Sequence, residues 1–209
     1  PFDSDSDYNE YVDGKPRYDG VRSFLESRGI ELPEGDPGDP PTAETVCGLG
    51  NRKNELVLQL IERDGVEPYA GSVAFVKAAR EAGLRRAVVS ASANCKDVLA
   101  AAGIADLFEV RIDGIVTDEK HLKGKPAPDT YLAGAEALGV EPSAACVFED
   151  AVSGVEAGHA GKFGHVVGVD RVNHAEALRE HGADVVVDDL GELILDGDEG
   201  ADPGSGDAP

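Results

Sequence analysis

The sequence predicts an α/β protein in which a doubly wound (Rossmann-like) parallel sheet follows a small helical domain. From about residue 68 onward, short apolar runs alternate with segments of helical periodicity, which is the pattern of successive βαβ units. The residues before that point show helical periodicity and little that resembles a strand. The end of the chain contains only Asp, Glu, Gly, Pro, Ser and Ala. Three parts are therefore predicted: a helical domain over residues 1–67, an α/β core over residues 68–195 and a disordered acidic tail over residues 196–209.

The helical domain is inferred from two segments in which apolar residues recur every three to four positions. They cover residues 19–28 and 52–64, and a loop of Pro, Gly and acidic residues at 34–41 separates them. The chain starts at Pro1 and contains no methionine. We therefore expect the helical domain to be incomplete at its N-terminus.

The core begins with a helix over residues 72–82, because Val73 and Val76 share one face with later alanines and Gly83 can end the helix. The elements that follow are expected in regular alternation. Further helices are predicted over residues 96–102, 128–138, 154–160 and 175–181. Strands are predicted over residues 86–90, 110–112, 145–148, 165–169 and 184–187.

The composition excludes several classes of protein. The 209 residues include 41 Asp and Glu against 19 Lys and Arg, a net charge of −22 that argues against binding to nucleic acid or anionic membranes. No apolar run approaches the ~18 residues of a membrane-spanning helix, and no signal peptide is visible. Three scattered cysteines form no disulfide framework. A cytoplasmic monomer fits these features best.

Polar residues directly after the strands are candidates for a binding site, since ligands of open α/β sheets bind beyond the carboxyl ends of the strands. Ser90, Ser92 and Asn94 follow the strand at 86–90, where hydroxyl and amide groups can hold a phosphate or simply cap a helix. Lys125 lies in a loop stiffened by two prolines, and its ammonium can neutralise a phosphoryl oxygen. A surface turn is the alternative interpretation of that loop.

Adjacent carboxylates follow the strand at 145–148. Glu149 and Asp150 stand at its end and open a turn that contains Gly154, an arrangement that suits the oxygen-preferring Mg²⁺ ion. Capping of the next helix is the alternative role for this acidic pair. The three strand-end groups together would bring a hydroxyl, a cation and a metal site to one cleft, which is what phosphoryl transfer requires.

These motifs resemble motifs two to four of the haloacid dehalogenase superfamily, and they are most similar to its β-phosphoglucomutase-like branch. The resemblance rests on residues 88–94, 124–129 and 147–158, and it extends to segments 11–17 and 48–54 of the helical domain, which look like parts of that branch's cap domain. It covers the chain from about Tyr8 to Leu193. The resemblance implies that residues 1–67 form a cap over the core.

The resemblance also implies roles for individual residues. Ser90 would bind the transferring phosphoryl group, Lys125 would balance its charge, and Glu149 and Asp150 would hold Mg²⁺. Ser92 and Asn94 would contact the phosphate or the sugar. In the cap, Arg17 would grip a second phosphate, and Lys53 and Asn54 would line the substrate side, although ion pairing and capping are the alternatives for these three.

The family's nucleophile is the first aspartate of an Asp-x-Asp motif that follows its first strand. Asp3 and Asp5 match that spacing, but no apolar strand precedes them and they lie too close to Arg17. The expectation is a core that lacks its first strand and a chain that is itself inactive. The predicted function is Mg²⁺-dependent phosphoryl transfer on a small phosphorylated metabolite, as a sugar-phosphate phosphatase or a β-phosphoglucomutase-like mutase. The alternative is a non-catalytic protein that binds phosphometabolites.

Overall fold

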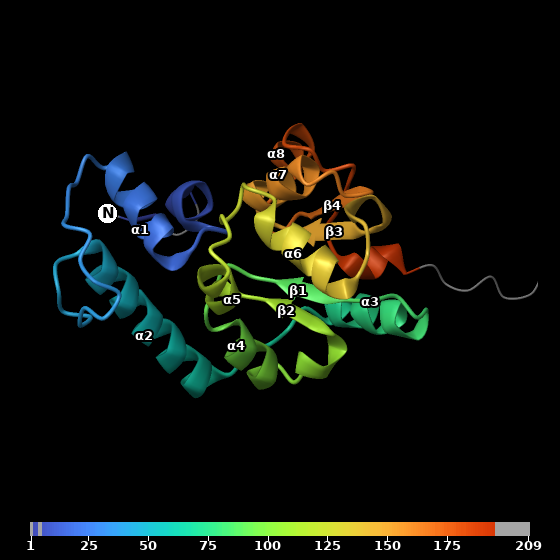
Figure 1. Cartoon of the computed structure of the whole chain (residues 1–209), viewed down its shortest axis with the longest axis horizontal. Coiled ribbons are helices and arrows are strands. Elements are labelled where there is room, and N and C mark those ends of the chain that lie inside the picture. Colours follow the sequence, from blue (N-terminus) through green and yellow to red (C-terminus); the bar gives the residue numbers. More distant parts are fainter. Residues whose placement is uncertain (1, 4–5, 195–209) are drawn as a thin grey trace, which may run out of the picture.

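A computed structural model describes residues 2–3 and 6–194 of the chain, and it confirms an α/β protein with parallel strands (Figure 1). Two long helices, α1 and α2, lie to one side of the strands. The predicted acidic tail at 196–209 lies outside the described residues. None of the described helices is long and apolar enough to cross a membrane.

The N-terminal region contains a short π-helix at Tyr8–Val12, α1 at Arg17–Ser27 and α2 at Val46–Asp64. Helix α2 begins six residues before the predicted segment at 52–64. Its start is fixed by Thr45, whose side chain accepts a hydrogen bond from the Gly48 backbone N–H at 2.9 Å. Gly48 and Gly50 weaken the helical pattern in the sequence. Gly50 is needed because an added Cβ would lie 2.8 Å from the Tyr18 ring of α1.

The α/β region follows the predicted order with shifts of one or two residues at most boundaries. Helix α5 was not predicted; it starts where the Asp113 carboxylate accepts from the Val116 backbone N–H at 3.0 Å. The helices are α3 (Ala70–Glu81), α4 (Cys95–Ala101), α5 (Gly114–Glu119), α6 (Asp129–Leu138), α7 (Val152–Ala160) and α8 (Ala175–Glu180). The strands are β1 (Ala87–Val89), β2 (Val110–Ile112), β3 (Cys146–Glu149), β4 (His165–Val169) and β5 (Val185–Val187). Short 3₁₀ turns are η2 (Ala105–Leu107), η3 (Pro142–Ala144) and η4 (Leu190–Leu193).

The strands form two parallel sheets where the sequence predicted one. Strand β1 pairs with β2, and β3 pairs with β4, which pairs with β5. Within residues 2–3 and 6–194, no strand pairs with the second edge of β1 or of β3. Helix α6 holds the two sheets together, because its Gly134 packs on Val89 of β1 while its Tyr131 packs in the same cluster as Val147 of β3.

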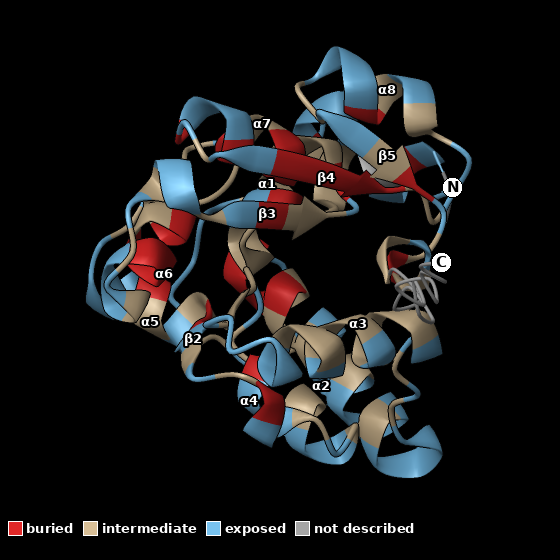
Figure 2. Cartoon of the chain, turned by 90° about the vertical axis from the view of Figure 1, so that its right-hand side faces the viewer, coloured by how far each residue is buried: buried red, intermediate tan, exposed pale blue. Residues whose placement is uncertain are grey.

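The core lies between the three-stranded sheet and the helices that cover it. Helix α7 packs against β3 and β4, and α8 packs against β4 and β5. Figure 2 shows the buried residues gathered along β4 and on the inner sides of α6 and α7. The carboxyl ends of β1 and β3, on neighbouring edges of the two sheets, carry Ser90 and Glu149 of the predicted site.

Candidate active site

One cavity of about 1020 Å³ brings all the predicted site residues together. It lies between the N-terminal helices α1 and α2 and the carboxyl ends of β1 and β3. Of the nine predicted residues that line it, six belong to the α/β region, one to the start of α1 and two to α2. The predicted residues in the cavity wall are Arg17, Lys53, Asn54, Ser90, Ser92, Asn94, Lys125, Glu149 and Asp150.

The segment after β1 is a tight loop with its hydroxyls fixed by the backbone. The Ser92 N–H donates to the Ser90 Oγ at 3.2 Å, and the Asn94 N–H donates to the Ser92 Oγ at 3.1 Å. Gly114 supports this loop from behind, since an added Cβ there would lie 2.8 Å from the backbone nitrogen of Ala93. The loop therefore presents Ser90 and Ser92 to the cavity in defined positions.

Lys125 and Glu149 form a nearly buried ion pair. The Lys125 Nζ donates to the Glu149 Oε2 at 2.9 Å, and the two side chains are only 7% and 10% exposed. The Tyr131 hydroxyl donates to the same oxygen at 2.5 Å. Burial, followed by the charge of Glu149, raises the pKa of Tyr131 well above its usual value, so this phenol stays a donor.

The acidic pair after β3 has the chemistry that a hard cation needs. Glu149 uses Oε2 for Lys125 and Tyr131, and the structure gives its Oε1 no hydrogen-bond partner within residues 2–3 and 6–194. Asp150 is exposed at the cavity wall. Gly154 makes room for the Glu149 side chain, since an added Cβ would lie 2.2 Å from its Cγ. Two carboxylates with available oxygens fit Mg²⁺, which keeps several water ligands.

At the opposite end of the cavity, Arg17 is held by neutral groups. Its Nη1 donates to Asn51 Oδ1 at 3.2 Å, and its Nη2 donates to Asn54 Oδ1 at 2.8 Å. No acidic side chain in the described part of the chain forms an ion pair with it. The guanidinium is thus oriented by hydrogen bonds while its charge remains available to an anion.

Two asparagines orient this end, and sequence reasoning missed one of them. Asn51 donates from Nδ2 to the Pro37 and Asp39 carbonyl oxygens, so its Oδ1 faces Arg17. The Asn54 Oδ1 also accepts from the Asn94 Nδ2 at 2.6 Å and so links α2 to the loop after β1. Asn51 lies three positions before Asn54, which places both on one face of the helix. That spacing was the only signal in the sequence that pointed to Asn51.

Lys53 shares its part of the cavity with Tyr8 and Asp13, neither of which the sequence singled out. The Lys53 Nζ lies 5.6 Å from the centre of the Tyr8 ring. The surrounding protein removes part of the water around this ammonium group and lowers the pKa of Lys53. Burial, and next the charges of Asp150 and Glu149, raise the pKa of Asp13. Asp13 therefore lies near the predicted metal ligands.

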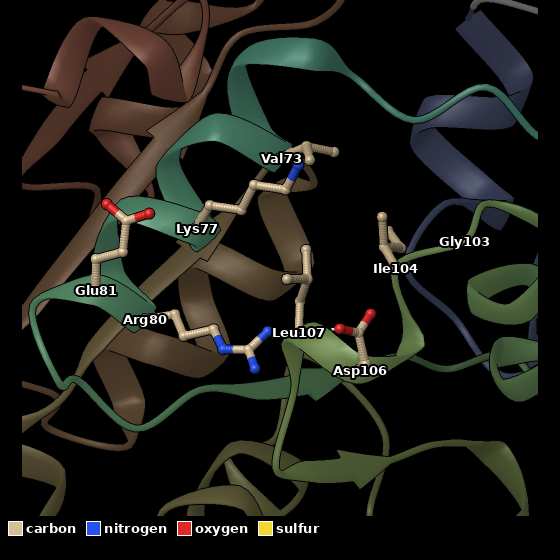
Figure 3. A pocket seen from close by; sticks show the side chains of 8 residues that line it. All are labelled: Val73, Lys77, Arg80, Glu81, Gly103, Ile104, Asp106 and Leu107. Carbon is tan, nitrogen blue, oxygen red and sulfur yellow. Dashed lines mark hydrogen bonds and ion pairs between the residues drawn. The ribbon is translucent and has the colours of Figure 1, made fainter.

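A second cavity of about 640 Å³ lies between α3 and residues 103–107 (Figure 3). Its wall combines apolar side chains with two cations and two acids, and Arg80 pairs with Asp106 at 3.4 Å across it. None of the predicted site residues lines it. Its charges are balanced within the protein, which makes it a weaker anion site than the cavity at the strand ends.

Comparisons with known proteins identify the family. A family model described as haloacid dehalogenase-like hydrolase matches residues 4–162. A β-phosphoglucomutase of Mycobacterium tuberculosis is 56% identical over 197 residues, which cover 93% of this chain and 75% of the relative. Hexitol phosphatase A of Escherichia coli is 30% identical over 142 residues, covering 66% and 61%. A crystal structure of β-phosphoglucomutase from Clostridium difficile superposes with a TM-score of 0.75 at 25% identity, covering 92% and 79%. The chain therefore belongs to the haloacid dehalogenase-like hydrolase family, in its β-phosphoglucomutase-like branch.

Proposed function

We propose that this protein carries out Mg²⁺-dependent phosphoryl transfer on a sugar phosphate. The observation that carries this proposal is a single cavity with a cationic group at each end, Lys125 and Arg17, in a chain whose net charge is −22. A phosphorylated ligand would gain charge neutralisation there.

Each residue of the α/β end has a defined task in this proposal. Ser90 donates a hydrogen bond to the transferring phosphoryl group, and Lys125 offsets its negative charge. Glu149 and Asp150 hold Mg²⁺, which supplies further neutralisation of charge on the phosphoryl oxygens. Such a site acts by positioning and by electrostatic stabilisation, since phosphoryl transfer needs little other help from the protein.

A mutase is favoured over a simple phosphatase because the cavity has a second anion site. Arg17 stands with Asn54 at the far end and suits a phosphate that is bound but not transferred. The relative with 56% identity is named β-phosphoglucomutase. In this proposal residues 1–67 serve as a cap over the α/β core, and the protein is a cytoplasmic monomer.

The nucleophile is the part of the reaction that the described residues do not supply. Asp3 caps an exposed turn by accepting from Ser6. Asp113 directly follows β2, but it is buried, caps α5, pairs with Arg111 and does not line the cavity. A further strand between the unpaired edges of β1 and β3 would join the two sheets and could carry an aspartate to this point. For the 209-residue chain alone, we propose binding without turnover, so a phosphate-binding protein without activity remains the second candidate.

The test measures binding and turnover separately on the 209-residue chain. Titration calorimetry with β-glucose 1-phosphate and Mg²⁺ should show saturable binding that weakens about tenfold in the Asp150→Asn variant without change in the folded state. Phosphorus NMR of the same samples should show no conversion of the ester. Turnover above that of a Lys125→Ala control would refute the claim that the chain supplies no nucleophile. Absence of binding to any phosphate ester would refute the proposed function.

A further inference from the structure

Tyr8 and Asp13 are brought to the cavity together by a rare backbone element. The π-helix at Tyr8–Val12 closes with the Asp13 N–H donating to the Tyr8 carbonyl at 2.8 Å, five residues back. Short π-helical turns are uncommon and occur often at functional sites. Both side chains line the large cavity, and Tyr8 is 38% exposed there.

Gly14 fixes this pair against the α/β region. Its φ of +68° is a backbone conformation that side chains disfavour. An added Cβ would lie 2.5 Å from the Ser153 Oγ in the first turn of α7 and 3.4 Å from the Cβ of Ala151, which directly follows Asp150. The close approach of this glycine thus sets where the Asp13 carboxylate stands relative to the predicted metal ligands.

The charge of Asp13 acts on Lys53 and Lys125 through space, without direct contact. No ion pair joins it to a lysine or arginine among residues 2–3 and 6–194, although Lys53 and Lys125 line the same cavity. Nor do acids, cysteines or histidines of that part of the chain gather in a group of three that could hold a metal ion. By itself, a carboxylate opposes the binding of any phosphate, so its place in an anion-binding cavity calls for a hydrogen-bond donor on the ligand.

We propose that Asp13 and Tyr8 recognise the sugar part of the substrate, which rests on the function proposed above. The Asp13 carboxylate accepts a hydrogen bond from a sugar hydroxyl, and the Tyr8 ring covers the C–H face of the sugar. A carboxylate offers only acceptors, and a sugar hydroxyl supplies the donor that phosphate oxygens lack. An aromatic ring adds a flat apolar surface with a polar tip. The ligand class is therefore a phosphorylated sugar or polyol, as opposed to a phosphate ester without hydroxyls.

The test compares a ligand that has hydroxyls with one that has none. Binding of β-glucose 1-phosphate and of inorganic phosphate is measured by titration calorimetry on the 209-residue chain and on Asp13→Ala, Asp13→Asn and Tyr8→Leu variants. Glu119→Gln is the matched charge control, because Glu119 is exposed at the end of α5 and does not line the cavity.

The expected result is a loss that depends on the ligand. Asp13→Ala should weaken the affinity for β-glucose 1-phosphate about 10- to 100-fold, the range for a hydrogen bond to a charged group. Its affinity for inorganic phosphate should be unchanged or slightly higher. Asp13→Asn should recover part of the loss through its amide oxygen. Tyr8→Leu should weaken only the affinity for the sugar phosphate. Glu119→Gln should change the affinity for either ligand by no more than about twofold.

Gly14→Ala tests the placement of Asp13 without touching its carboxylate. It should reproduce the selective loss of the sugar phosphate, because the Cβ would push the segment away from Ser153. Gly29→Ala is its control, since Gly29 has a similar φ of +62° but no atom within 4 Å of the added Cβ. Circular dichroism spectra should show that both variants are folded.

The outcomes separate this inference from the function on which it rests. If the unaltered chain binds both ligands and Asp13→Ala weakens both equally, the role of Asp13 is structural and the inference is wrong. If Asp13→Ala raises the affinity for both ligands, Asp13 acts only by repelling their phosphate groups and the inference is again wrong. If the unaltered chain binds neither ligand, the proposed function fails as well.

Discussion

The two ends of the cavity hold their positive charge in opposite ways. At the strand end, Lys125 is nearly buried and already paired with Glu149. At the helical end, Arg17 is oriented by neutral groups, the amide oxygens of Asn51 and Asn54 and the Tyr18 ring 5.9 Å away. A buried pair is costly to break, whereas a cation held by neutral groups keeps its charge for a ligand. The strand end should therefore matter for stability as well as binding, and the helical end mainly for binding.

The largest expected effect is at the strand end. Lys125→Met leaves the Glu149 carboxylate nearly buried beside Tyr131 without its cation, so the free energy of unfolding should fall by about 3–5 kcal/mol. Urea unfolding at pH 7 measures this loss. The Lys125→Met/Glu149→Gln double variant should lose less unfolding free energy than the Lys125→Met variant, because the second substitution removes the uncompensated charge.

The matched control is an exposed pair in the helical region. Arg22 and Glu34 are bonded at 2.8 Å with side chains that are 40% and 54% exposed. Arg22→Met should lower the free energy of unfolding by about 0–1 kcal/mol. Equal losses for Arg22→Met and Lys125→Met would contradict the contrast between the two ends.

A smaller effect is expected at the helical end, and it concerns binding. Arg17→Lys keeps the charge but loses the planar fork, and Arg17→Ala loses both. Affinity for glucose 1,6-bisphosphate should fall about 10- to 100-fold in Arg17→Ala and less in Arg17→Lys, with little change in unfolding free energy. Calorimetry measures the affinity and urea unfolding the stability. If the bisphosphate bound the Arg17→Ala variant as tightly as the unaltered chain, Arg17 would not form a second anion site.

The smallest effect concerns acid sensitivity on the strand side. Burial alone would raise the pKa of Asp170, but hydrogen bonds from the backbone N–H groups of His174, Ala175 and Val172 hold it below its usual value. A lowered pKa in the folded state contributes stability above the unfolded value of about 3.9, and that contribution is lost as the pH falls through the folded value. The Asp170→Asn variant should thus be less stable than the unaltered chain at pH 7, and the difference should shrink towards pH 3. Urea unfolding at several pH values measures it, and a constant difference would assign the effect to packing.

The strand end could be predicted from the sequence because its chemistry is local. Ser90 and Glu149 stand directly at the ends of apolar runs, and parallel strands bring their ends to neighbouring edges. Asn51 and Asp13 could not be predicted in the same way. Their positions depend on contacts with distant residues, such as the Pro37 carbonyl that orients Asn51 and the Ser153 side chain that meets Gly14. The division into two sheets could not be predicted either, because the alternation of strands and helices does not show which strand edges pair.

Asn54 has a consequence for how the two ends communicate. Its single oxygen accepts from Arg17 and from Asn94 at the same time, at 2.8 and 2.6 Å. A ligand that draws either donor away changes the bond that remains for the other. Occupancy of one end is then energetically coupled to occupancy of the other, and this coupling is reciprocal by thermodynamic linkage. A substrate with two phosphates would experience the cavity as one cooperative unit in place of two independent sites.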